Sequence, residues 1–162
     1  PRGYFGGHYA ADSRWVDILA AETGWIIRNL GQNGLEIPSA SPAFPVDTDL
    51  LIVMLGSNDL LQGYSPTQAA ERLERFLSDI SLDRSKILVI APPPVKRGAW
   101  VPNQQLIDDS RTFAQLCHAL AAQMGIRFAD AGKWDILLAY DGVHFTEQGH
   151  RTFAAGLLEE LR

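Results

Sequence analysis

Hydrophobic residues occur along this chain in two alternating patterns, continuous runs and helically spaced positions. The runs at 50–55 and 86–91 are almost uninterrupted, which is typical of strands buried on both faces of a parallel sheet. Residues 25–30 and a shorter run at 126–129 predict two more strands. The pattern therefore predicts four strands, with polar or helically patterned segments between them.

Apolar residues three or four positions apart predict helices between and around these runs. Capping residues mark the helix ends, because a Ser, Thr, Asp or Asn side chain can accept hydrogen bonds from the first free backbone N–H groups. Ser65 followed by Pro66 is one such start, and Gly125 is a stop signal. The predicted helices cover 12–23, with Asp12 or Ser13 as N-cap, and about 103–124. Another begins with Pro66 after the cap Ser65, and a final one is capped by Thr146.

Strands that alternate with helices imply a parallel sheet with helices on both faces. We therefore expect a three-layer α/β/α sandwich with a flavodoxin-like parallel sheet. Residues 1–162 are expected to form a single domain, because the length suits one core and no repeat or long linker divides the chain. In sheets of this kind, sites form beyond the carboxyl ends of the strands.

Composition excludes several classes of partner. The net charge is −5 and the basic residues are scattered, so nucleic acid and anionic membranes are not expected partners. No run reaches the ~18 apolar residues of a membrane span. The lone Cys117 excludes an internal disulfide and is consistent with the cytosol, although a start at Pro1 leaves secretion undecided. Cys117 lies on an apolar helix stripe, which predicts a core thiol.

No cofactor or metal is expected, because cysteine pairs and close histidine clusters with zinc spacing are missing from the sequence. The sequence leaves the oligomeric state open, including an assembly of identical copies.

The first candidate for chemistry is the pair Asp141 and His144, which stands just before the last predicted helix. Side chains at i and i+3 can meet there, and a carboxylate on Nδ1–H would leave Nε2 free to accept a hydroxyl proton. The alternative is a turn before a helix that contains a satisfied structural histidine. Spacing alone does not separate these two interpretations.

Two further segments follow predicted strands. In 56–59, the Asn58 amide is a candidate donor to a developing oxyanion, although Gly, Asn and Asp are also ordinary turn residues. Ser57 is interpreted as part of that turn rather than as a nucleophile. In 29–34, two glycines suit a tight turn whose backbone N–H could face a ligand, and the Lys-Ser/Thr ending of a phosphate loop is missing.

The remaining histidines and the aromatic residues near these segments have simpler interpretations. His150 is on the apolar side of the last helix and is expected to be structural, whereas His118 is expected to be solvated. His8, in a glycine-rich opening, has no assigned role. The aromatic residues expected near the carboxyl edge of the sheet, as pocket walls or as packing, are Trp100, Trp134 and Tyr140.

Taken together, these segments resemble the SGNH, or GDSL, hydrolase superfamily of esterases, thioesterases and lipases. That family has a Gly-Asp-Ser nucleophile block, an oxyanion glycine, a Gly-x-Asn-Asp block and an Asp-x-x-His block. Residues 29–34 resemble the glycine block, with Gly34 at the oxyanion position. Residues 56–59 match the third block and 141–144 match the last.

The nucleophile block and the strand before it have no counterpart in 1–162, and Pro1 to Tyr4 resemble the segment that follows that block. The family's sheet order resembles 2-1-3-4-5, which makes the first strand interior, so 25–30 and 50–55 should flank an empty strand position. The resemblance thus implies that the first strand and its serine lie upstream of residue 1.

The resemblance implies a serine hydrolase that cleaves small-molecule carboxylic esters or thioesters through an acyl-enzyme. His144 would be the base and then the acid, Asp141 would orient it, and Gly34 and Asn58 would form the oxyanion hole. One alternative is a catalytically inactive relative that binds acyl or carbohydrate ligands. Another is an unrelated flavodoxin-like module for flavin or phosphate, which would show no cluster of Asn58 and His144 at the strand ends.

Overall fold

Three parallel strands form the middle layer of the structure, a computed structural model in which residues 9–162 are described. They lie in the order β1 (Leu51–Val53), β2 (Ile87–Ala91) and β3 (Arg127–Asp130). His8 and the segment Pro1 to Tyr4 lie outside the described residues. The strands expected at 50–55, 86–91 and 126–129 are all present, each with bounds shifted or shortened by one to three residues.

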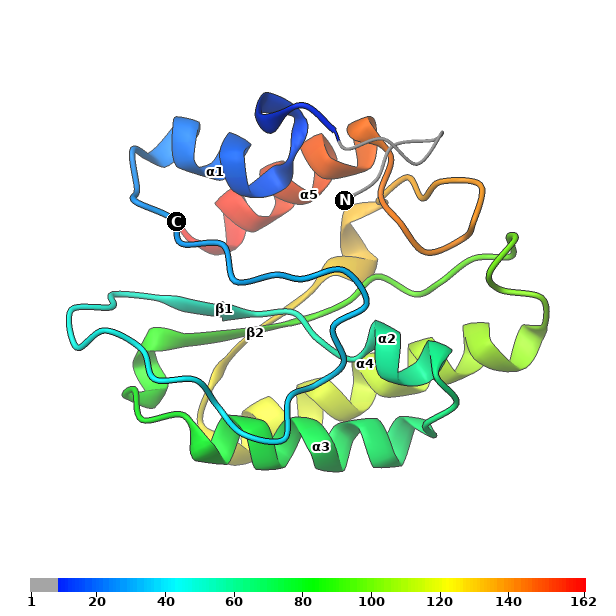
Figure 1. Ribbon diagram of the computed structural model, residues 1–162, viewed down its shortest axis with the longest axis horizontal. Helices are drawn as coiled ribbons and strands as arrows, with labels where there is room; N and C mark the ends of the chain where they lie inside the picture. Colours follow the sequence, from blue (N-terminus) through cyan, green and yellow to red (C-terminus); the bar gives the residue numbers. More distant parts are fainter. Residues whose placement is uncertain (1–8) are drawn as a thin grey trace.

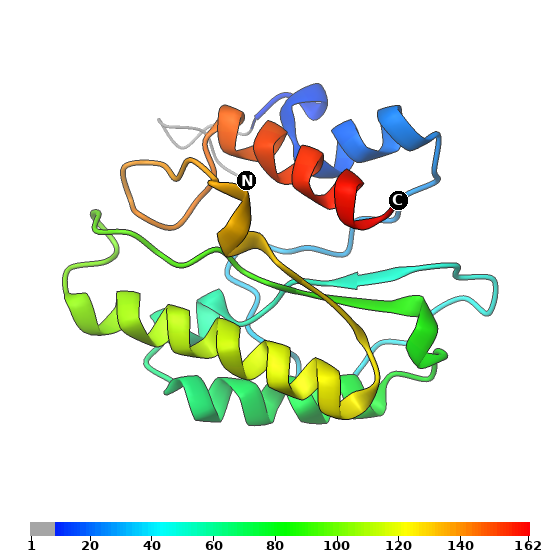
Figure 2. The same ribbon diagram turned by 180° about the vertical axis from the view of Figure 1, so that it is seen from behind.

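Helices cover both faces of this sheet (Figure 1; Figure 2 shows the reverse side). On one face lie α1 (Trp15–Thr23) and α5 (Glu147–Glu160), and on the other lie α3 (Pro66–Asp79) and α4 (Gln104–Met124). The short helices are α2 (Ser57–Leu61) and the 3-10 helices η1 (Ala11–Ser13), η2 (Arg84–Lys86) and η3 (Ala131–Trp134). The three-layer α/β/α sandwich is confirmed.

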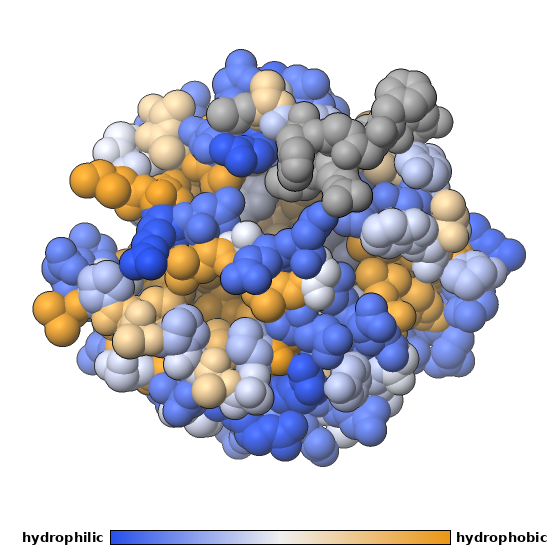
Figure 3. Space-filling view, in the orientation of Figure 1, coloured by the Kyte–Doolittle hydropathy of each residue, from blue (hydrophilic) through white to orange (hydrophobic). Residues whose placement is uncertain are grey.

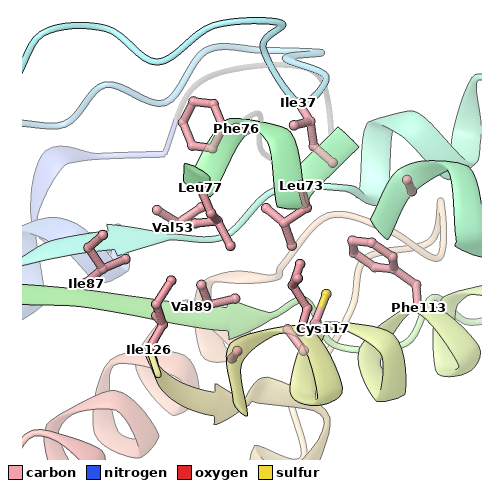
Figure 4. Packing of buried hydrophobic residues seen from close by; sticks show 14 of the residues in the cluster. Ile37, Val53, Leu73, Phe76, Leu77, Ile87, Val89, Phe113, Cys117 and Ile126 are labelled. Atoms are coloured by element: carbon pink, nitrogen blue, oxygen red, sulfur yellow. The ribbon is translucent and has the colours of Figure 1, made fainter. Parts of the chain in front are cut away.

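The central strand β2 is buried on both faces, as its apolar run predicts. Ile87 and Val89 point into the cluster formed with α3 and α4, shown in Figure 4, whereas Leu88 and Ile90 point toward α1 and α5. Cys117 belongs to the first cluster and is 1% exposed. Alternate side chains of one strand therefore join the two layers of helices to the sheet.

Local capping determines most helix starts. Ser65 accepts a hydrogen bond from Gln68 N, the Gln68 side chain returns one to Ser65 N, and Pro66 occupies the first helical position of α3. Asn103 and Thr146 cap α4 and α5 in the expected way.

The expected start of the first helix is wrong. Helix α1 begins at Trp15, after Arg14, and has no side-chain cap from Asp12 or Ser13. Instead, the backbone N–H of Trp15 lies 3.4 Å from Nδ1 of His150 on α5. A contact between distant segments, rather than a local cap, satisfies the first N–H of this helix.

The strand predicted at 25–30 is also wrong. This segment forms neither helix nor strand, Ile26 is 103% exposed, and Trp25 and Leu30 are each more than 40% exposed. Of its residues, Ile27 packs on the cluster beside α1 and α5. A strand needs a neighbour for its backbone groups, and in residues 9–162 none pairs with this segment.

The edge of β1 that faces away from β2 is likewise unpaired within the described sheet. Hydrophobic side chains gather across the middle of the corresponding face of the molecule, at the level of β1 (Figure 3). A strand that fills this edge remains a prediction.

No helix among the described residues is long and apolar enough to cross a membrane.

Candidate active site

Three loops follow the carboxyl ends of the three strands and carry the candidate residues. The loop after β1 leads to Asn58, the loop after β2 spans 92–103, and the segment after β3 leads to Asp141 and His144. Because the strands are parallel, all three loops start from the same edge of the sheet.

Asp141 and His144 form the hydrogen bond that their spacing predicts. Nδ1 of His144 lies 2.8 Å from Oδ2 of Asp141, while the backbone N–H groups of Val143 and His144 donate to Oδ1 at 2.8 and 2.9 Å. The Asp141 side chain is 9% exposed and that of His144 is 31% exposed. A carboxylate fixed by two backbone donors thus holds one ring nitrogen and leaves Nε2 on the opposite side of the ring.

The same hydrogen bonds keep Asp141 ionised. Burial is the largest single influence and raises the pKa of the Asp141 carboxyl, but the two backbone N–H groups and the His144 ring together outweigh it and hold the pKa below its usual range. A charged acceptor on Nδ1–H favours the tautomer with a free Nε2 lone pair, which is the form that a general base requires.

The loop after β2 packs directly on the segment that carries the dyad. Lys96 N donates to Gly142 O at 2.9 Å, and Trp100 N donates to Asp141 O at 3.0 Å. A Cβ on Gly98 would lie 2.4 Å from the Asp141 backbone, and one on Gly142 would lie 2.0 Å from Lys96 O. Both positions therefore require glycine, and Gly142 also has a φ of +83°.

This backbone contact places Trp100 beside the dyad. The Trp100 and His144 rings meet edge to face, with centroids 4.9 Å apart, and Trp100 remains 54% exposed. Tyr140 is also exposed next to Asp141, whereas the half-buried Trp134 packs against Phe153. Trp100, one of the three aromatic residues expected near this edge, thus contacts His144 directly.

Asn58 is at the start of α2, and its side chain faces the glycine block. Nδ2 of Asn58 donates to the carbonyl of Leu35 at 2.9 Å, one residue beyond Gly34. Gly34 has a φ of +69° and is exposed. Since an amide nitrogen carries two hydrogens, one remains for another acceptor. The structure thus brings Asn58 and the Gly34 turn together, and a shared oxyanion between them remains a prediction.

Gly56 explains how the chain turns from β1 into α2. Its φ is +114°, and a Cβ there would lie 2.3 Å from the Phe113 ring. Any larger residue would force either the Phe113 ring or the start of α2 to shift. The expected strand-ending turn at 56–59 is therefore the first turn of a helix.

Among the residues that the structure describes, no serine or cysteine hydrogen-bonds to His144. Cys117 is buried, and burial raises the pKa of its thiol to about 12, so it is not a thiolate at neutral pH. Within residues 9–162 no group of three or more His, Cys, Asp or Glu residues is arranged to hold a metal ion.

His150 is buried with an unusual environment. It is 3% exposed, Nδ1 faces Trp15 N, and Nε2 has no hydrogen-bond partner among the described groups. Burial lowers the pKa of His150 to about 4 from 6.5, with the charge of Arg14 adding to the effect. His118, in contrast, is exposed and contacts the Phe128 ring.

The free energy of unfolding should therefore decrease as the pH falls from 6.5 to about 4. In that interval the unfolded chain binds a proton at His150 and the folded chain does not, which costs on the order of 3 kcal/mol. Urea unfolding at several pH values measures the slope of the free energy of unfolding against pH. In a His150→Leu variant the slope between pH 6.5 and 4 should become smaller, and an unchanged slope would contradict the assignment.

Comparison with known proteins follows the same segments. The sequence profile of the GDSL-like lipase/acylhydrolase family matches residues 2–152. The chain belongs to this family. This is a family of ester hydrolases, so the chain has the fold and the family membership of an ester hydrolase. A comparison with curated proteins gives no match.

Solved structures of GDSL-like esterases have the same fold. The native aryl esterase of M. smegmatis is 25% identical with a TM-score of 0.78, over 96% of this chain and 87% of that one. A proposed arylesterase from Agrobacterium tumefaciens str. C58 is 26% identical with a TM-score of 0.82, over 97% and 89%. A carbohydrate acetylesterase family member from Sinorhizobium meliloti, 22% identical with a TM-score of 0.81 over 99% and 92%, supports the fold alone.

One feature of this GDSL-like site was missed by sequence reasoning, namely the packing of 96–101 on 139–142. Its bonds join backbone groups of distant segments, so no side-chain pattern reports them. The only trace of this packing in the sequence is the pair Gly98 and Gly142. The reason that both positions need glycine becomes clear only when the two segments are in contact.

Proposed function

We propose that this chain is the main part of a serine hydrolase that cleaves carboxylic esters or thioesters through an acyl-enzyme. The observation that carries the proposal is the Asp141–His144 pair, held by three hydrogen bonds at the carboxyl edge of the sheet. A neutral imidazole with its Nδ1–H on a buried carboxylate is suited to accept a hydroxyl proton at Nε2.

The nucleophile is proposed to be a serine upstream of residue 1, on a strand that pairs with the free edge of β1. Two observations support this placement: β1 is paired on one side within the described sheet, and residues 25–30 form no strand beside it. A strand in that position would end at the same edge as His144, because it would be parallel to its neighbours.

The proposed reaction has two steps. The serine oxygen attacks the ester carbonyl while His144 Nε2 takes its proton, and the same nitrogen then returns that proton to the leaving alcohol or thiol. Water repeats this sequence on the acyl-enzyme. The Gly34 N–H and the second Asn58 hydrogen are proposed to bind the carbonyl oxygen when it becomes negative.

Two proteins test this proposal with p-nitrophenyl acetate as substrate. Residues 1–162 alone should be inactive, and the same chain preceded by its upstream strand and serine should hydrolyse the ester, because a triad acts as a unit. Alanine at the upstream serine should remove the activity. Full activity of residues 1–162 alone, lost on Ser57→Ala or Cys117→Ala, would contradict the proposal.

A further inference from the structure

Arg72, in the middle of α3, binds the segment that leaves the Gly34 turn. Its Nε donates to Oδ1 of Asp59 at 2.7 Å, and its Nη2 donates to the carbonyl of Ile37 at 2.7 Å. One planar guanidinium therefore joins two acceptors that are 22 residues apart in the sequence.

Asp59 completes this arrangement from the other side. Its side chain is 0% exposed, and Oδ2 accepts the backbone N–H of Ile37 at 3.0 Å. Both backbone groups of Ile37 are thus occupied by the Asp59–Arg72 ion pair. The Ile37 side chain is 1% exposed in the core, so the residue is fixed at its backbone and at its side chain.

Two further groups orient the guanidinium. Tyr64 has its ring 4.6 Å from Arg72 Cζ and its hydroxyl 3.3 Å from Nη1, and Glu36 lies 3.4 Å from Nη2. Because Nε, Nη1 and Nη2 all form hydrogen bonds, the Arg72 guanidinium has one orientation in which it can bind all of its partners.

The neighbour of Asp59 is Asn58, which binds Leu35 O. Residues 35 and 37 are therefore both attached to the start of α2, and Gly34 immediately precedes them. A shift of this segment would move the Gly34 N–H relative to the Asn58 amide, which are the two proposed oxyanion donors.

We propose that Arg72 is a positioning residue for the oxyanion hole, acting through Asp59 and Ile37 on the Gly34 turn. This inference rests on the proposed function. Arg72 does not touch the substrate; it fixes the distance between two donors that belong to different segments of the chain. Donors of this kind act in the transition state, so a misplaced pair affects kcat more than KM.

The decisive variant is Arg72→Lys in the protein that contains the upstream serine. A lysine retains the charge, but its point-like ammonium cannot reproduce the fixed fork between Asp59 and Ile37 O. We expect kcat to fall by about 10- to 100-fold with KM within about twofold. Arg84→Lys is the matched control, because Arg84, in η2, also donates to a backbone carbonyl, that of Leu77 at 2.9 Å near the C-terminal end of α3. Its kcat should equal that of the unmodified protein.

A second variant keeps the test valid if the lysine protein does not fold. Arg72→Met combined with Asp59→Asn removes both charges together, which avoids an unpaired buried carboxylate. This variant should show the same loss in kcat.

Amide hydrogen exchange in residues 1–162 provides a measurement that does not depend on activity. The Ile37 N–H should exchange at least ~10-fold faster in Arg72→Lys, while core amides of β2 keep their rates. Unchanged kcat in either folded variant, or unchanged Ile37 exchange, would overturn the inference. An unmodified protein that has its serine and shows no esterase activity would instead refute the proposed function, and the exchange experiment would still decide the role of Arg72.

Discussion

Replacing His144 by alanine is expected to lower kcat of the serine-containing protein by up to about 10⁶-fold, the effect found when one member of a triad is removed. The reason is that His144 is the group that moves the proton in both proposed steps. Ester hydrolysis under substrate saturation measures the loss. Asp141→Asn should cost about 10⁴-fold, because the ring would no longer be held in the tautomer with a free Nε2.

His118→Ala is the matched control for this result. His118 is exposed and contacts Phe128 on β3, away from the dyad, so its loss should leave turnover unchanged. Circular dichroism of each variant shows whether the fold is intact. Substantial activity in a folded His144→Ala protein would mean that another group is the base, and the assignment of the dyad would fail.

Replacing Asn58 by alanine is expected to lower kcat by roughly 10²- to 10³-fold, the usual cost of one oxyanion donor. KM should change little, because the donor acts on a charge that develops in the transition state. The substitution also removes the bond to Leu35 O, so part of its effect is a loss of stability. Urea unfolding separates the two effects.

Asn103→Ala provides the comparison for stability. Asn103 is not one of the proposed oxyanion donors. Its side chain accepts a hydrogen bond from the Leu106 N–H at 3.0 Å as the N-cap of α4. Its removal should destabilise the fold by about 1 kcal/mol and leave kcat unchanged. A folded Asn58→Ala protein with the same kcat as Asn103→Ala would show that Asn58 does not bind the oxyanion.

The parts of the structure that were predicted correctly depend on local interactions. Ser65, Asn103 and Thr146 cap their helices because the bonds span three residues. The Asp141–His144 bond also spans three residues, and it forms in the turn where the spacing places it. Strand β2 was predictable because burial on both faces requires a continuous apolar run.

The failures depend on partners that the sequence does not reveal. Residues 25–30 have an apolar composition, but a strand forms only where another strand accepts and donates its backbone bonds. The first backbone N–H of helix α1, at Trp15, faces His150, which is 135 residues away. The contacts of Arg72 were missed for the same reason, since its acceptors at Asp59 and Ile37 become neighbours only in the folded chain.

The packing of Gly98 against Gly142 has a consequence for protein engineering. The two segments are joined through backbone N–H and C=O groups, so the exposed side chains of Arg97 and Ala99 contribute to none of these bonds. The residues at these positions and at Trp100 can therefore be randomised beside His144 while both glycines are kept. Libraries built there would vary the surroundings of His144, the proposed base, and leave its hydrogen bond to Asp141 in place.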